Sequence, residues 1–166
     1  MGKQLTIKQR RTLDEIIGDN LDSLVRFARF RTGSIEDAED IVHDAIVRLI
    51  DKDVASIKKE MLKPYVFRIV HNLCIDYQRR MVSYVPLDGI REAFQYEAAE
   101  VAEEVGRVNS MLGKLPVREA EVIRMNVVDG LSFVDISHIL NVPVSTLKSR
   151  YKAGMERLRP LLSGLE

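Results

Sequence analysis

The sequence predicts an all-α protein built of two small helical domains joined by an acidic linker. Apolar residues recur at helical spacings of three and four along most of the 166 residues, and no run shows the alternation of a half-buried strand. An acidic stretch separates two such blocks, and the second block contains two short helices joined by a tight turn. We place the first domain at residues 1–82, the linker at 83–104 and the second domain at 105–166.

Composition and charge exclude several classes of protein. The chain has 25 Lys and Arg against 25 Asp and Glu, so a uniformly basic DNA-coating protein is excluded, although local basic patches are not. No uncharged apolar run approaches the roughly 20 residues of a membrane helix, and the basic N-terminus lacks the apolar segment of a signal peptide. Cys74 is the only cysteine, which leaves no internal disulfide. We therefore expect a cytoplasmic protein.

The first domain is predicted to begin with two amphipathic helices. Leu13 and Leu24 belong to the apolar face of the first helix, and Gly-Asp-Asn at residues 18–20 predicts a break in it. Ser34 is predicted to cap the second helix, with Asp37 in the capping-box position. The second helix has a wide apolar stripe that requires a core, formed by Ala38, Ile41, Val42, Ala45, Ile46, Leu49 and Ile50.

Two more helices are predicted to complete this domain. A short helix covers residues 55–62. Pro64 begins a longer helix, because the first helical turn does not need the missing N–H of proline. That helix ends near Arg79 and Arg80, and its apolar face comprises Val66, Ile69, Val70, Leu73 and Tyr77.

The linker is predicted from its charge and its turn-forming residues. From Asp88 to Glu104 there are six acidic residues and one basic residue, Arg91. Such a stretch between two helical blocks is typical of a solvated tether.

The second domain is predicted to contain a helix-turn-helix. Pro116 opens a helix that Gly130 ends. Ser132 caps the next, short helix, and Asn141 lies in the turn, where it tolerates the left-handed conformation of a tight corner. Ser145 is predicted to cap the final helix.

The final helix is predicted to bind DNA. Residues 144–160 hold five Lys or Arg and one acid, a local charge of +4. Recognition helices contact bases and phosphates near their N-termini, where this helix has Ser145, Thr146, Lys148, Ser149, Arg150 and Lys152. A merely solvated surface helix is the alternative. The coincidence of a cap, a small residue at the helix crossing (Ser137), a turn and a basic helix favours DNA binding.

The sequence also resembles a known family. LPVREAEVIRMNVVDGLSFVDISHILNVPVSTLKSRYKAGMERLR is similar to the fourth domain of bacterial sigma factors. AEDIVHDAIVRLI resembles the helix of the second sigma domain that docks on RNA polymerase, and PYVFRIVHNLCIDYQRR resembles the adjoining helix that reads the melted −10 element. Both domains occur in a short chain with nothing similar to the third, which is the layout of the extracytoplasmic-function (ECF) group.

The resemblance implies roles for the first domain. The −10 strand would be held by Arg68, Asn72, Asp76, Arg79 and Arg80. The polymerase clamp would be met by Asp37, Asp40, Ile41, Asp44 and Arg48, for which a solvated acidic face is the alternative. Phe67 and Tyr77 offer rings either for stacking on bases or for core packing. An amide at Asn72 in an otherwise apolar helix is expected to need a partner.

The implied function is that of an alternative sigma factor, with core RNA polymerase, promoter DNA and an anti-sigma factor as partners. The acidic linker would suit a basic polymerase channel, or act as a plain tether. We expect no catalytic site, cofactor or metal, because the three His residues and Cys74 are scattered and no Gly-rich phosphate loop is present. A stand-alone helix-turn-helix regulator and a sigma-like decoy that sequesters a partner are the rival hypotheses.

Overall fold

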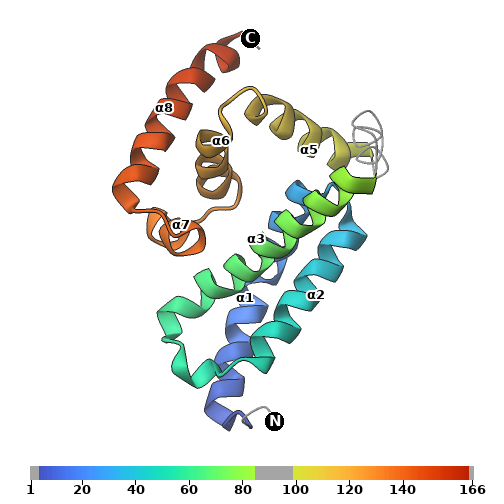
Figure 1. Ribbon diagram of the computed structural model, residues 1–166, viewed down its shortest axis with the longest axis vertical. Coiled ribbons are helices and arrows are strands. Elements are labelled where there is room, and N and C mark those ends of the chain that lie inside the picture. Colours follow the sequence, from blue (N-terminus) through green and yellow to red (C-terminus); the bar gives the residue numbers. More distant parts are fainter. Residues whose placement is uncertain (1–3, 85–98, 165–166) are drawn as a thin grey trace. The chain divides into compact units, whose positions relative to one another are not determined.

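The computed structural model describes residues 4–84 and 99–164, in which every regular element is helical (Figure 1). The chain divides into two compact units, Met1–Glu97 and Ala98–Glu166. The all-α prediction is therefore confirmed. Most of the predicted linker, residues 85–98, lies outside the described residues, and residues 99–104 belong to the first helix of the second unit. Within the described ranges, no helix has the length and apolarity needed to cross a membrane.

Residues 4–84 of the first unit form a bundle of three long helices in which each helix packs on the other two. A short 3-10 turn, η1 (Val54–Ser56), precedes the third helix. The three helices are α1 (Ile7–Thr32), α2 (Ile35–Asp51) and α3 (Lys59–Tyr84).

Helix α1 is continuous, so the break predicted at residues 18–20 is wrong. The helix begins with a capping box that the sequence analysis missed, in which Thr6 Oγ1 accepts from the Gln9 N–H at 3.2 Å and Gln9 Oε1 accepts from the Thr6 N–H at 2.8 Å. Leu13 and Leu24 on either side of the glycine are buried. Burial of both flanking turns outweighs the roughly 1 kcal/mol by which one glycine weakens a helix.

The start of α2 agrees with the prediction. Ser34 has extended backbone and its Oγ accepts a hydrogen bond from the Asp37 N–H at 3.2 Å. The Asp37 carboxylate itself accepts a hydrogen bond at 2.7 Å from the hydroxyl of Tyr77 on α3. Asp37 thus links two helices as well as lying in the first turn of one.

Helix α3 begins earlier than predicted, at Lys59 rather than Pro64. The predicted helix over residues 55–62 is replaced by η1 and the first turn of α3. Inside a helix, proline removes one hydrogen bond to the carbonyl four residues earlier. Leu62 and Pro64 are both buried in the bundle, and this burial offsets the lost bond.

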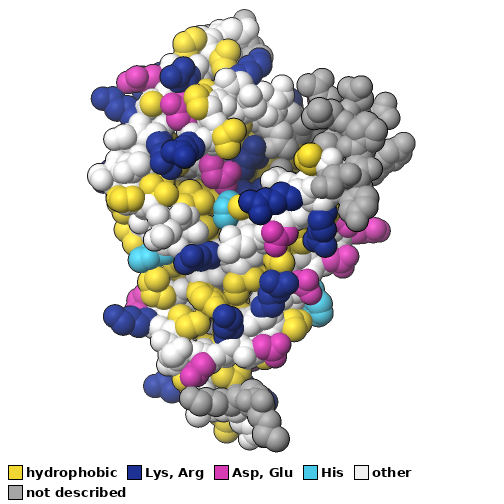
Figure 2. All heavy atoms as spheres, in the orientation of Figure 1, with side chains coloured by type: hydrophobic (Ala, Val, Ile, Leu, Met, Phe, Trp, Pro, Cys, Tyr) yellow, Lys and Arg dark blue, Asp and Glu magenta, His cyan; other side chains and the backbone are white. Residues whose placement is uncertain are grey.

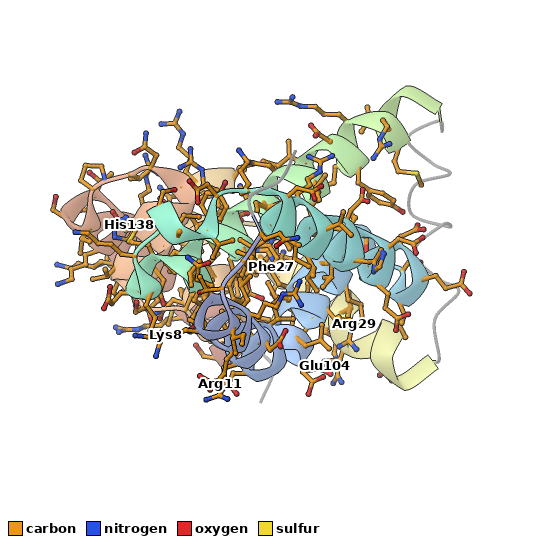
Figure 3. The ribbon with its side chains drawn as sticks, turned by 90° about the horizontal axis from the view of Figure 1, so that it is seen from below. Lys8, Arg11, Phe27, Arg29, Glu104 and His138 are labelled. Atoms are coloured by element: carbon orange, nitrogen blue, oxygen red, sulfur yellow. The ribbon has the colours of Figure 1, made fainter. Side chains whose placement is uncertain are left out.

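Two buried phenylalanine rings pack together in the core of the bundle, and Figure 3 labels one of them, Phe27. Phe27 on α1 and Phe67 on α3 have no exposed surface, and their ring centroids lie 5.5 Å apart in an edge-to-face arrangement. His71, one turn further along α3, meets the Phe27 ring edge-on at 6.3 Å. Phe67 is therefore a core residue, and the alternative that its ring stacks on bases is wrong.

Residues 99–164 of the second unit form four helices and a π-helical turn that continues one of them. Its core includes Leu112, Leu115, Ile123 and Leu158. As predicted, Pro116 precedes a helical stretch that ends before Gly130, whose φ is +69°. The elements are α5 (Ala99–Leu112), α6 (Val117–Ile123), η2 (Arg124–Val128), α7 (Phe133–Leu140) and α8 (Val144–Ser163).

Helices α6 and α8 approach each other closely at Gly154, which the sequence analysis did not single out. A methyl group on Gly154 would lie 2.5 Å from Ile123 Cδ1 and 3.2 Å from Glu119 Cβ. Beside this contact, Arg157 Nε lies 3.2 Å from Glu119 Oε2. An alanine here requires the end of the Ile123 side chain to rotate and Glu119 to give by a few tenths of an ångström, whereas a leucine would push the two helices apart.

We expect Gly154→Leu to lower the free energy of unfolding by about 1–3 kcal/mol, because the added atoms overpack a filled contact. Urea unfolding followed by circular dichroism measures the change. Gly106→Leu is the matched control, since an added Cβ on this α5 residue meets nothing within 4 Å. Equal stability of the two variants would contradict the close crossing of α6 and α8.

Candidate nucleic-acid interface

Helices α7 and α8 form the predicted helix-turn-helix. Ser132 Oγ accepts from the Asp135 N–H at 3.1 Å and so caps α7. Asn141 ends α7 in the left-handed region, with φ 56° and ψ 48°, and its N–H donates to the Ser137 carbonyl. The Val142 N–H donates to the same carbonyl at 3.3 Å. The predicted roles of Ser132 and Asn141 are both confirmed.

The start of α8 differs from the prediction. Helix α8 begins at Val144 with Pro143 as its N-cap, so Ser145 lies inside the first turn and does not cap it. The Pro143 carbonyl accepts from the Leu147 N–H at 3.1 Å, and the Ser145 carbonyl accepts from Ser149 Oγ at 3.1 Å. A proline before the first turn is favourable because its fixed φ suits the approach to a helix and the N–H it lacks has no partner there.

The inner face of α8 is fixed by packing. Leu147 is fully buried, and Gly154 and Leu158 follow on the same face at helical spacing. Between them, the Tyr151 ring meets the Phe133 ring of α7 edge-on, with centroids 5.5 Å apart. These contacts hold the two helices of the motif in one orientation and determine which α8 residues face solvent.

The predicted DNA-binding residues lie on the outer side of α8. Lys148 and Lys152 are exposed, as are Ser145 and Ser149, and the spacing of these four residues places them on one face. Thr146 and Arg150, four residues apart, are half-buried at the border of that face. Figure 2 shows Lys and Arg side chains over α8. We call these six residues the α8 strip.

A second polar strip follows the exposed side of α3. Its residues recur every three or four positions and all are exposed, whereas Val66, Val70 and Cys74 on the other side are buried. Asn72 is exposed too, so the argument that a buried amide needs a partner does not apply to it. Asn72 is grouped with the charged residues because it lies on the same exposed side of α3. The α3 strip consists of Arg68, Asn72, Asp76, Arg79 and Arg80.

The predicted polymerase-binding residues of α2 do not all share one environment. Asp40, Asp44 and Arg48 are exposed at spacings of four and form one face, and Figure 2 shows acidic side chains over α2. Ile41 has 8% of its surface exposed and belongs to the bundle core. Asp37 is half-buried against Tyr77. Across residues 4–84 and 99–164, no three His, Cys, Asp or Glu side chains are grouped to hold a metal ion.

The environment of Tyr77 differs from that of an exposed tyrosine. Its ring is half-buried, and burial followed by the hydrogen bond to Asp37 raises the pKa of its hydroxyl well above the usual 10. The phenol therefore stays protonated and remains a donor. The Tyr77 hydroxyl bonds to a residue 40 positions earlier in the chain. Sequence spacing does not reveal such a pair, so the sequence analysis missed this role of Tyr77.

Two small helical units, one of them with a helix-turn-helix, define a DNA-binding protein of the transcription-factor class. Residues 16–82 match the family described as Sigma-70 region 2, and residues 105–158 match Sigma-70, region 4. The ECF RNA polymerase sigma factors SigW and SigM of Bacillus subtilis (strain 168) are 28% and 26% identical to the chain. These alignments cover 98% and 90% of the chain, and 95% and 94% of the relatives.

Two solved structures have a similar fold. CnrH, in complex with the cytosolic domain of CnrY, gives a TM-score of 0.70 at 22% identity, over 93% of this chain and 90% of that one. The sigma factor RpoE of Bartonella quintana, in complex with the anti-sigma factor NepR, gives 0.62 at 22% identity, over 90% and 98%. The chain belongs to the ECF group of RNA polymerase sigma factors. It is an alternative sigma factor that directs transcription initiation, and sigma factors are initiation factors rather than catalysts themselves.

We expect Asn141→Val to lower the free energy of unfolding by about 1–2 kcal/mol, because a β-branched residue is strained at positive φ. Asn141→Gly is the matched control and should unfold close to the wild type, since glycine has no Cβ to strain. Thermal unfolding of the full chain measures both. Equal losses in the two variants would show that the turn does not depend on the left-handed conformation.

Proposed function

We propose that this sigma factor binds core RNA polymerase and contacts a promoter at two points, the −35 element with residues 105–166 and the melted −10 element with residues 1–82. The residues between α3 and α5, 85–98, would connect the two. The observation that carries the proposal is the presence, in two separate units of one chain, of two exposed polar helix faces that include Arg or Lys, the α3 strip and the α8 strip.

The α8 strip suits duplex DNA. Lys148 and Lys152 are exposed point charges for phosphates, whereas Arg150 carries the planar fork that pairs with a guanine edge in the major groove. Half-burial of Arg150 limits its side-chain freedom, which favours a directional contact. Residues 144–160 supply the charge of +4 that would bring this helix to the phosphates.

The α3 strip suits a single strand. Arg68, Arg79 and Arg80 can follow the phosphates of an opened strand, and the Asn72 amide can pair with exposed base edges. The carboxylate of Asp76 within the strip disfavours a purely electrostatic contact and can accept a hydrogen bond from a base amino group. This mixture of charges and hydrogen-bonding groups supports recognition of bases.

The exposed face of Asp40, Asp44 and Arg48 on α2 is the proposed docking surface for the polymerase, which would perform the chemistry. Ile41 would contribute by holding α2 in the bundle, because its side chain is buried. CnrH and RpoE have similar folds and were solved with CnrY and an anti-sigma factor, respectively. We extend this to the present protein and propose an anti-sigma partner that holds it inactive in the cytoplasm.

Addition of the protein to bacterial core polymerase should produce promoter-specific transcripts from a genomic template library, with core polymerase alone as the control. Sequencing of the transcript starts gives the promoters. The absence of specific transcripts, with a known sigma factor active in the same assay, would contradict the proposed function. Transcription that survives loss of Lys148 and Arg150 together would contradict the −35 assignment.

Arg150→Ala should weaken holoenzyme binding to a promoter by about 1–3 kcal/mol. If Arg150 reads a base, Arg150→Ala should cause no loss of affinity for promoters in which that base has been changed. If Arg150 contacts a phosphate, the loss of affinity should be nearly uniform across promoter sequences. The slope of log affinity against log salt concentration should then become shallower by about one. Arg107→Ala, which removes an exposed Arg from α5, is the control. Unchanged affinity and selectivity would remove Arg150 from the interface.

A further inference from the structure

Two consecutive residues of α3 donate hydrogen bonds to the corner where α1 ends and α2 begins. The Tyr77 hydroxyl donates to Asp37 Oδ2 in the first turn of α2 at 2.7 Å. Gln78 Nε2 donates to the Arg31 carbonyl in the last turn of α1 at 3.0 Å. Both bonds join segments 40 or more residues apart. We call Arg31, Asp37, Tyr77 and Gln78 the corner clamp.

The corner that receives these bonds is itself held firmly. Arg31 has 7% of its surface exposed, its guanidinium lies 3.4 Å from the centroid of the Phe27 ring, and its Nη1 donates to the Phe27 carbonyl at 3.0 Å. Gly33 then turns the chain with φ +72°, and Ser34 caps α2. The acceptors for Tyr77 and Gln78 are therefore fixed by the core of the bundle.

Tyr77 and Gln78 lie along α3 among the last three residues of the α3 strip. Asp76 precedes Tyr77, and Arg79 and Arg80 follow Gln78, so all five residues fall within about one and a half helical turns. A hydrogen bond to a carboxylate is directional, whereas a phenylalanine at position 77 would fill the same space without fixing a direction. The clamp thus fixes the rotation and position of the helix end that carries these charges.

We infer that the corner clamp positions the C-terminal end of the α3 strip for the opened DNA strand, with Tyr77 and Asp37 as positioning residues that do not contact DNA or polymerase themselves. This inference rests on the proposed function, because it concerns the same −10 contact. It also reassigns Asp37, which the sequence analysis placed in the polymerase-binding set. The raised pKa of Tyr77 agrees with a hydroxyl that is held as a donor.

The test uses the full chain bound to core polymerase and a single-stranded oligonucleotide from the −10 region of a promoter found by the transcription assay. Tyr77→Phe should weaken oligonucleotide binding roughly three- to tenfold, the scale of one hydrogen bond, with little change in affinity for core. Asp37→Ala should do the same, and Asp37→Asn should largely restore binding because an amide oxygen can still accept. Fluorescence anisotropy measures both affinities.

A double-mutant cycle separates positioning from simple stability. Tyr77→Phe and Arg80→Ala should be non-additive, because Arg80 depends on the clamp, whereas Tyr77→Phe and Lys148→Ala should add. Tyr151→Phe, the same chemical change in a ring that packs on Phe133, should leave oligonucleotide binding unchanged. Gln78→Ala, at an exposed side chain, provides a second route if Tyr77→Phe folds poorly.

The outcomes are distinguishable. A lower melting temperature with unchanged oligonucleotide binding in Tyr77→Phe and Gln78→Ala would overturn the inference and leave the proposed function intact. A weaker affinity of Asp37→Asn for core polymerase would also overturn it, because Asp37 would then be a docking charge. Failure of the wild-type holoenzyme to bind the oligonucleotide would instead contradict the proposed −10 contact.

Discussion

The edge-to-face contact between Phe27 and Phe67 decides which side of α3 meets solvent. Both rings are fully buried, so α3 cannot rotate about its axis without exposing Phe67 or breaking the contact. With that rotation fixed, the residues of the α3 strip must face outward. The acidic face of α2 is oriented by the same core, because α2 packs on both α1 and α3.

In the second unit, packing likewise fixes which side of α8 faces solvent. Its buried residues, Leu147 and Gly154 among them, fix the inner face, and the basic residues are left outside. The net charge of zero is then a sum of segregated regions, since the +4 of residues 144–160 is countered by −5 between residues 88 and 104. Affinity for DNA grows with the number of phosphates contacted. A single small basic helix is therefore expected to bind DNA weakly until the chain, bound to polymerase, also makes its −10 contact.

Most features set by local chemistry were predictable from the sequence, although the Thr6–Gln9 capping box was missed and Pro143, not Ser145, is the N-cap of α8. Ser132 and Ser34 cap helices, and Asn141 occupies the left-handed turn, because each depends on residues within a few positions. The α8 strip was predictable for the same reason, since helical spacing alone separates its residues from the buried Leu147 and the half-buried Tyr151.

Features set by tertiary packing were not predictable in this way. Burial of the turns on either side keeps α1 helical at Gly18. Burial of Leu62 and Pro64 lets α3 begin at Lys59, before Pro64. Gly154 matters because α6 crosses it, and the role of Tyr77 depends on an acceptor 40 residues away. Periodicity identifies a buried face but does not say which partner lies against it.

We propose that one chain supplies two promoter contacts, which it makes together only when bound to polymerase. The affinities of the free protein and of the holoenzyme for one promoter duplex, measured by anisotropy over a range of salt concentrations, test this proposal. We predict weak binding by the free protein, with a shallow salt dependence set by α8, and much tighter, promoter-specific binding by the holoenzyme. Binding by the free protein as tight and as specific as that of the holoenzyme would contradict the proposed two-point contact and indicate a stand-alone regulator.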